Sequence, residues 1–357
     1  MMQNKAQQAF FALQELYASR GYRPYKMSRF EEYELYVRNK EFLPSNQVIT
    51  FPARDGRLMA LKPDVTLSIV KNAPEKPGVV EKLYYNESVY RAEHGGEIRE
   101  LSQAGLECVG DLQPYDICEV VHLAVRSLAL FGERYILDIS HMGLLEAVLS
   151  ALPADLRETA AQCLAQKNIH ELKAVCSGQE EKTVEKLIAL IESAGRAEDV
   201  LPALRTVMND EHELNALNDL SQIIAILDSQ GLGDFVRVDF SLWSKMTYYN
   251  GVVFRGYLAN IPEAVLSGGV YDRLAVRMGK HSRAVGFAVY MDLLEQLQGT
   301  DAFDVDIVLL CKVDEDPIAV NRAATALLEK GSVLVCTQIP DGCRAKEIIV
   351  FEKGEAK

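Results

Sequence analysis

Alternating apolar and polar residues are concentrated in the stretch 82–110, where an aromatic run, a polar His-Gly-Gly tip and a second alternating run follow one another. Two such runs joined by a glycine-rich turn predict an antiparallel hairpin. Because successive side chains of a strand face opposite sides, Gln103 and Glu107 share one face of the second strand. With Arg91 at the end of the first strand, this face could bind a small zwitterion. An ordinary charged surface hairpin is the alternative for this stretch by itself.

The same patterning predicts elements along the rest of the chain. Apolar residues at helical spacing predict helices at 4–20, 64 to about 72, 114–131, about 291–297 and 317–330. Alternating or short apolar runs predict strands at 47–53, 57–62, 135–140, 235–240, 247–257, 263–267, 284–290, 304–311, 332–337 and 346–351. Turns are expected at Asp55-Gly56 and Ser267-Gly268-Gly269, and Asp64 or Thr66 is expected to cap the helix that follows.

Residues 141–230 differ in character, because they are almost entirely helical in pattern and rich in Ala, Leu, Glu and Lys. We interpret them as a helical insertion in a strand-rich protein. Hairpins, a first helix and this insertion predict an α+β fold, with an antiparallel sheet flanked by helices. We expect a core at 1–299, with the insertion at about 141–230, and a small C-terminal α/β unit at 300–357. Such a short unit is near the lower limit for an independent core.

Composition narrows the class of protein. Of the 357 residues, 48% are hydrophobic and 25% are charged, which is typical of a globular protein. No apolar run approaches the roughly 20 residues that span a bilayer, and no signal peptide is recognisable, so we expect a cytoplasmic protein without membrane contact. The net charge of −13 disfavours broad nucleic-acid binding. The seven cysteines lack metal-ligand spacing, which disfavours both zinc and a disulfide framework.

Five stretches, in order, resemble the class II aminoacyl-tRNA synthetases and histidyl-tRNA synthetase in particular. The hairpin resembles their motif 2, and the 284–294 stretch, AVGFA followed by a helical pattern, is similar to motif 3. The other three resemble the LRPEGT segment, the histidine-recognition stretch and the GGRYD turn of that enzyme, and they lie at Leu61–Thr66, Tyr248–Phe254 and Gly268–Asp272. The resemblance implies a class II synthetase-like core and a C-terminal unit similar to part of an anticodon-binding domain.

Departures from the family pattern fall where ATP would bind. Asp292 and Leu293 stand where motif 3 should end in Glu-Arg, and a leucine cannot supply a charged fork for phosphate oxygens. Ser244 replaces a further arginine, and Glu97 replaces a basic residue of the motif 2 loop. Lys62 also replaces an arginine, but this change is smaller because lysine keeps the positive charge. Little then remains to stabilise the charge of adenylyl transfer. We therefore expect no aminoacylation, no tRNA partner, no catalytic residues, no metal and no cofactor.

The residues expected to bind the amino acid match the family pattern better than those expected to bind ATP. Only one of the neighbours Tyr248 and Tyr249 can face it, and we expect Tyr249. Asp64 is one methylene shorter than the glutamate of the family. The resemblance implies these contacts for free histidine: Asp64, Thr66 and Gln103 at the ammonium, Arg91 at the carboxylate, Glu107 and Tyr249 at the imidazole, and Tyr271 closing the wall.

A pocket that binds histidine without activating it resembles the regulatory subunits of ATP phosphoribosyltransferase. In that family a synthetase-like chain pairs with a short catalytic subunit that performs the first step of histidine biosynthesis. The implied partners are the catalytic subunit, free histidine and a second copy in a homodimer. One alternative is a divergent class II enzyme that adenylates an amino acid or another carboxylate, which Arg91 supports and Leu293 opposes. Another is an assembly protein with a vestigial pocket.

Overall fold

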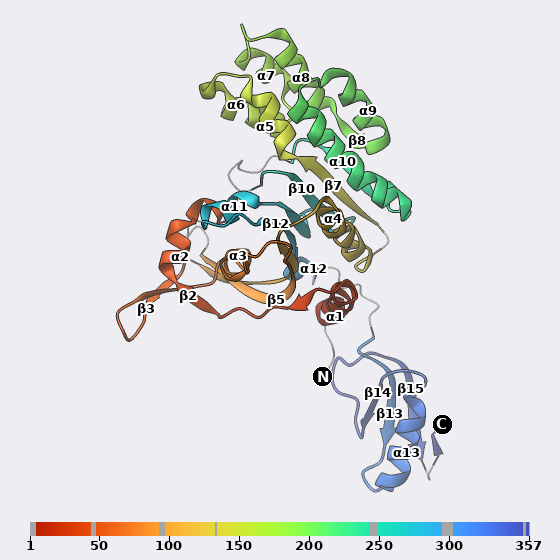
Figure 1. The fold of residues 1–357 in the computed structure, drawn as a ribbon. Helices are drawn as coiled ribbons and strands as arrows, with labels where there is room; N and C mark the ends of the chain where they lie inside the picture. Colours follow the sequence, from red (N-terminus) through yellow and green to blue (C-terminus); the bar gives the residue numbers. More distant parts are fainter. Residues whose placement is uncertain are drawn as a thin grey trace. The chain divides into compact units, whose positions relative to one another are not determined.

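The chain forms two compact units in a computed structural model (Figure 1), the core Gln8–Gln296 and a second unit made of Met1–Gln7 and Leu297–Lys357. The structure describes residues 5–43, 48–92, 97–132, 134–242, 249–294, 303–352 and 355–356.

The core is organised around a large sheet, in which nine strands of the described residues pair. All neighbouring strands are antiparallel except the pairs β1–β5 and β7–β9. The strands, in spatial order, are β1 (Arg23–Pro24), β5 (Val80–Ala92), β6 (Ile98–Gly110), β12 (Arg283–Tyr290), β11 (Leu266–Val270), β10 (Val252–Leu258), β7 (Tyr135–His141), β9 (Val236–Asp239) and β8 (Ala194–Arg196). The predicted α+β fold is confirmed, and the predicted hairpin is its longest strand pair, β5–β6.

Two helices, α1 (Lys5–Ala18) and α4 (Pro114–Ala129), pack on one face of this sheet. The Tyr17 hydroxyl lies 2.9 Å from the Ser127 hydroxyl and joins the two helices. Gly256 of β10 faces α4 so closely that a β-carbon there would come within 2.7 Å of the Leu128 side chain. Since α1 and α4 cover this face, polar side chains of the same strands that alternate to the other face remain available for a site.

A smaller three-stranded sheet and four short helical segments lie beside the other face. They share an apolar cluster that includes Tyr36, Leu67 and Leu274. Lys62, which follows the small sheet, is fully buried and pairs with Glu87 of β5, and its carbonyl accepts from the Tyr90 N–H at 2.9 Å. These segments are β2 (Phe30–Glu32), β4 (Leu58–Leu61), β3 (Thr50–Pro52), α2 (Tyr33–Arg38), η1 (Lys40–Phe42), α3 (Thr66–Asn72) and α11 (Asp272–Arg277); α12 (Met291–Leu294) follows β12.

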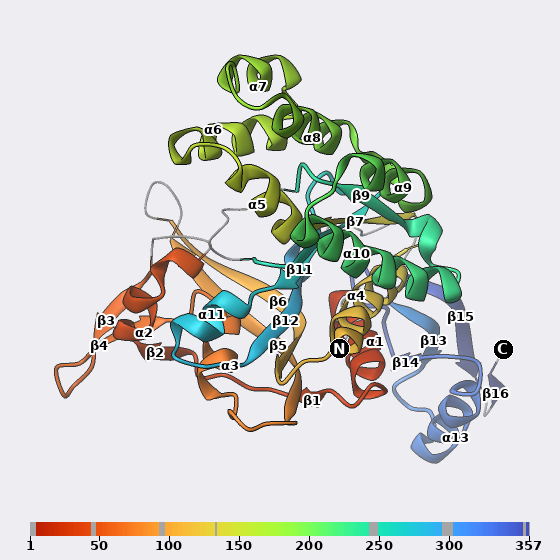
Figure 2. The same cartoon turned by 45° about the horizontal axis from the view of Figure 1, so that its top comes forward.

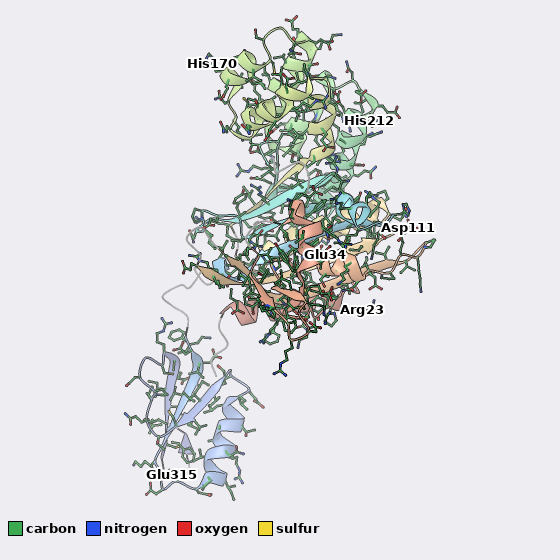
Figure 3. The ribbon with its side chains drawn as sticks, turned by 90° about the vertical axis from the view of Figure 1, so that its left-hand side faces the viewer. Arg23, Glu34, Asp111, His170, His212 and Glu315 are labelled. Atoms are coloured by element: carbon green, nitrogen blue, oxygen red, sulfur yellow. The ribbon has the colours of Figure 1, made fainter. Side chains whose placement is uncertain are left out.

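Residues 142–229 are mainly helical, as the pattern predicted, and their helices lie together beyond the β7–β9–β8 end of the sheet (Figure 2). The longest helix, α10, begins with a capping box between Asp210 and Glu213. His170 and His212 are exposed on this block (Figure 3). Its helices are α5 (Met142–Ser150), α6 (Ala154–Ala165), α7 (Ile169–Val175), α8 (Glu181–Glu192), α9 (Ala197–Val207) and α10 (Glu211–Ser229), followed by η2 (Gly233–Phe235). Among the helices of the described residues, none is both long and apolar enough to cross a membrane.

The second unit is a small α/β sheet in which β14 (Val333–Cys336), β13 (Val305–Cys311) and β15 (Ala345–Glu352) are parallel and β16 (Glu355–Ala356) is antiparallel. Its helix α13 (Pro317–Leu327) packs on one face, around a core that includes Ile307, Leu309 and Phe351. The helix begins at Pro317 because Asp316 caps it, and it ends three residues before the predicted 330.

The expected turn at Ser267-Gly268-Gly269 is wrong, because all three residues lie inside β11. Neither glycine adopts a positive φ. A β-carbon at Gly268 would lie 2.3 Å from the Gly286 carbonyl oxygen, and one at Gly269 would lie 2.6 Å from the Val252 carbonyl oxygen. Both glycines therefore permit close approach of neighbouring groups and do not bend the chain.

The boundaries of two neighbouring strands also differ from the prediction. The strand expected at 263–267 begins at Leu266, and the one expected at 247–257 begins at Val252. The remainder of the predicted 291–297 helix, beyond Leu294, lies outside the described residues, as do Tyr248 and Ser244.

Candidate functional site

All seven residues predicted to contact a ligand line one cavity of about 430 Å³. They come from four separate parts of the core: the segment before and at the start of α3, the β5–β6 hairpin, the segment before β10, and the junction of β11 with α11. The seven residues are Asp64, Thr66, Arg91, Gln103, Glu107, Tyr249 and Tyr271.

The floor of the cavity is made of three small residues, Gly286, Ala288 and Ser267, which we call the small-residue floor. They are neighbours on β12 and β11, where Ser267 pairs with Ala288. Gly286 pairs with Glu107 of β6, and a β-carbon at Gly286 would come within 1.7 Å of the Glu107 Oε2 atom. Glycine at this position therefore leaves the space that the Glu107 carboxyl group occupies.

Glu107 is the buried centre of a hydrogen-bond network. The Thr66 hydroxyl donates to its Oε1 atom at 2.6 Å, and the Tyr271 hydroxyl donates to its Oε2 atom. The pKa of Glu107 is raised to about 8, mainly by burial and in smaller part by the charge of Asp64, although the two hydrogen bonds lower it. The carboxyl group is therefore largely protonated at neutral pH, and it can share a proton with a basic ligand group.

This network gives Thr66 a contact that was not expected. The resemblance placed its hydroxyl at the ligand ammonium, and here the hydroxyl donates to Glu107, which leaves its oxygen able to accept from an ammonium. Tyr271, expected to close the wall, bonds to the same carboxyl group. Thr66 and Tyr271 thus both orient Glu107.

Asp64 and Arg91 form a charged corner of the cavity. The Asp64 Oδ1 atom accepts from the Leu67 N–H at 2.9 Å and so satisfies an amide of the first turn of α3, although the N-cap residue is Val65 and neither Asp64 nor Thr66. Burial raises the pKa of Asp64, although the charge of Arg91 acts in the opposite direction. The Arg91 Nε atom donates to the Pro63 carbonyl at 3.4 Å, which holds its guanidinium beside Asp64.

Gln103 and Tyr249 complete the polar lining. Gln103 is buried and pairs in register with Tyr290. The Tyr249 ring lies over Gly269, where a β-carbon would approach the ring to 2.7 Å. Burial raises the pKa of Tyr249 strongly, so its phenol stays protonated and can donate or accept a hydrogen bond.

Among the charged residues of the cavity that sequence reasoning missed is Arg255 of β10. Its signal was visible, because it is the single charged residue in the apolar strand Val252–Leu258. Because Gly256 faces α4, Arg255 beside it faces the cavity. Further lining residues that were missed are Glu41, Phe42, Leu43, Tyr85 and Tyr290.

The residues at the motif 3 positions do not form a phosphate-binding group. The Asp292 Oδ2 atom accepts from the Ser102 N–H at 2.9 Å, so this carboxylate is tied to the backbone of β6. Leu293 follows it on α12, and Glu97 is exposed before β6. A leucine thus stands where the family pattern has its cation, and Asp292 stands where the pattern has its glutamate. Within the described ranges, no three His, Cys, Asp or Glu side chains are grouped so that they could hold a metal ion.

Comparison with known proteins gives a family match over most of the chain. The model of the family described as histidyl-tRNA synthetase matches residues 2–294. An ATP phosphoribosyltransferase regulatory subunit of Halothermothrix orenii is 29% identical over 81% of this chain and 72% of its own length. A protein of the same name from Clostridium kluyveri is 26% identical over 94% of this chain and 90% of its own.

Solved structures share the fold. A protein from Bacillus halodurans C, described as an ATP phosphoribosyltransferase regulatory subunit/histidyl-tRNA synthetase, superposes with a TM-score of 0.78 at 22% identity, covering 97% of this chain and 93% of that one. A chain of the ATP phosphoribosyl transferase (HisG:HisZ) complex from Thermotoga maritima gives 0.64 at 23% identity, covering 80% and 97%. The histidyl-tRNA synthetase of Nostoc sp. PCC 7120 gives 0.76 at 17% identity, covering 96% and 84%.

Proposed function

We propose that this chain, which belongs to the histidyl-tRNA synthetase family, is a regulatory subunit of ATP phosphoribosyltransferase and not a synthetase. It takes part in the first step of histidine biosynthesis by binding a separate catalytic subunit. Relatives named as such regulatory subunits match most of the chain, and the Thermotoga maritima structure is a complex of the two kinds of subunit.

The lack of synthetase activity rests on the site where ATP would bind. An active class II site needs cations that neutralise the developing charge of the phosphates. In this chain the motif 3 positions hold Asp292 and Leu293, and Asp292 is tied to the Ser102 N–H. Leu293, in place of the family's arginine, cannot neutralise a polyphosphate, so adenylate formation is disfavoured.

The regulatory ligand is free histidine, held in the cavity around Glu107. The single observation that carries this assignment is the buried Glu107 carboxyl group, oriented by the Thr66 and Tyr271 hydroxyls. An imidazole nitrogen is a suitable partner for it, because the pKa of Glu107 is raised to about 8 and that of free histidine is about 6.5. Between about pH 6.5 and about pH 8 the pair then holds one proton, which the two groups can share.

The remaining contacts follow from the lining. Asp64 and Gln103 accept from the ammonium, Arg91 approaches the carboxylate, and Tyr249 bonds the second imidazole nitrogen. Binding regulates the catalytic partner if histidine has different affinities for two states of the complex. We also infer a homodimer formed through the synthetase-like core, and a cytoplasmic location, which suits a protein with seven free cysteines.

Calorimetric titration tests the ligand. We expect the protein to bind histidine and not ATP, and to lack ATP–pyrophosphate exchange. Exchange at the rate of a synthetase would instead support an enzyme that adenylates a carboxylate. Binding of neither ligand would indicate a role in assembly alone.

A variant tests the site. Glu107→Ala removes the imidazole partner and should abolish histidine binding, whereas Glu100→Ala, on an exposed part of the same strand, should not. Unchanged affinity of the Glu107 variant would refute the cavity as the histidine site. Co-elution on size-exclusion chromatography tests the binding of a short catalytic subunit. Sedimentation of the free chain tests the homodimer.

A further inference from the structure

One cation of the cavity is not accounted for by the contacts above. Arg255 is half-buried on β10, and its side chain makes no hydrogen bond or ion pair with any residue that the structure describes. Arg91 differs, because its guanidinium lies beside Asp64, whose negative charge compensates its positive charge. A half-buried guanidinium without an acidic partner costs free energy of desolvation, unless a ligand supplies the negative charge.

The sheet register places Arg255 across the small-residue floor from Glu107. Arg255 pairs with Ser267, Ser267 with Ala288, and Gly286, two residues before Ala288 on β12, pairs with Glu107. Glu107 on β6 and Arg255 on β10 are therefore separated by two strands and offset by two residues along them, which sets their backbones about 16 Å apart. Both side chains extend into this space, so the gap between their charged ends suits a small molecule with a basic group and an acidic group.

The residues between them leave this gap open. Gly286, Ala288 and Ser267 have short or absent side chains, and all three line the cavity. The Ser267 hydroxyl is 2.7 Å from the Tyr290 hydroxyl, which turns it towards β12. The guanidinium also acts on Tyr249, whose raised pKa it partly lowers, so its charge is felt inside the cavity.

We propose that Arg255, in addition to Arg91, binds the carboxylate of the amino-acid ligand, across the small-residue floor from the Glu107 group that binds the imidazole. This inference rests on the proposed histidine site and adds the residue that replaces the cation missing at Ser244. Histidine then contacts Glu107 through its imidazole and Arg255 through its carboxylate. Ligands without a carboxylate therefore bind more weakly. Arg255 is a specificity residue of the cavity.

The test compares two ligands on one variant. L-histidinamide keeps the ammonium and imidazole of histidine and replaces its carboxylate with a neutral amide. Arg255→Gln keeps most of the side-chain length and removes the charge. Loss of a charge-assisted hydrogen bond should lower the affinity for histidine about 10- to 100-fold, and the affinity for histidinamide less than about threefold. Both are measured by calorimetry on the full chain.

Controls separate this inference from the proposed histidine site. Arg237→Gln, on an exposed position of the same sheet outside the cavity, should alter neither affinity. Arg255→Lys keeps the charge without the planar fork, so it should weaken histidine binding less than Arg255→Gln does. It also supplies a test if the glutamine variant does not fold, as judged by circular dichroism.

Equal losses for the two ligands, or no loss for histidine, would overturn the role of Arg255 while leaving the cavity as a histidine site. If the unaltered protein binds histidine but Glu107→Ala binds it equally well, the proposed site itself is wrong. Failure of the unaltered protein to bind histidine would overturn both proposals.

Discussion

Replacement of Glu107 by Gln isolates the effect of burying a titratable group beneath the cavity. The substitution keeps the size of the side chain, and its amide oxygen can still accept from the Thr66 hydroxyl. The Tyr271 hydroxyl can rotate to accept from the amide N–H₂ group. The main change is therefore the loss of a proton-binding site.

The magnitude follows from the raised pKa. In the unfolded chain Glu107 loses its proton near its ordinary pKa of 4.5, whereas in the folded chain it keeps the proton up to about 8. Between these values the unfolded state binds fewer protons, so the stability of the protein falls as pH rises, by up to about 1.4 kcal/mol per pH unit. The Gln variant does not titrate. Its free energy of unfolding, relative to the unaltered protein, should therefore rise by about 2 kcal/mol from about pH 6 to about pH 8.

Urea unfolding followed by far-UV circular dichroism at several pH values measures this difference without any ligand. The matched control is Glu100→Gln, which removes an exposed carboxylate from the same strand and should leave the pH dependence of stability as it is. A difference between Glu107→Gln and the unaltered protein that stays constant over this pH range would refute the raised pKa and the proton sharing built on it.

Three other changes test the site and its supports. Above about pH 8, histidine affinity should fall about tenfold per pH unit, since the shared proton must then come from solvent, and calorimetry on Glu107→Gln should show no such fall. Lys62→Met removes the cation that pairs with Glu87, and leaves this mostly buried carboxylate with the Met27 N–H as a partner; it should cost about 3–5 kcal/mol in urea unfolding, most of which is recovered on adding Glu87→Gln. Gly268→Ala places a methyl group 2.3 Å from a carbonyl oxygen of β12 and should cost at least about 1–3 kcal/mol, whereas Gly132→Ala, in open space, should cost little by the same measurement.

The sequence predicted most where local pattern and the family resemblance agreed. Residues 82–110 alternate strongly, and the hairpin formed as predicted. The seven expected ligand residues meet in one cavity because each belongs to a motif whose place in the fold is fixed.

Other features depend on tertiary packing, which a local pattern does not contain. Gly268-Gly269 looks like a turn in sequence, but the close approach of β12 to these glycines decides their extended conformation. Arg255 was overlooked because one charge in an apolar strand is common, and its direction becomes clear only once Gly256 is seen against α4. The role of Thr66 likewise needed the position of Glu107 on a strand more than 40 residues away.

The segment from Lys62 to Thr66 connects the small sheet to the cavity. At one end Lys62 is fixed to β5 and follows the small sheet; at the other, Thr66 orients the Glu107 carboxyl group. Five residues span at most about 17 Å, and one of them is a proline with a fixed φ angle. The segment therefore has few alternative conformations. A subunit that shifts the small sheet would therefore also move Thr66 and change the affinity for histidine. Reciprocity then requires histidine to change the affinity for that subunit by the same factor, which makes this short segment a mechanical route for feedback.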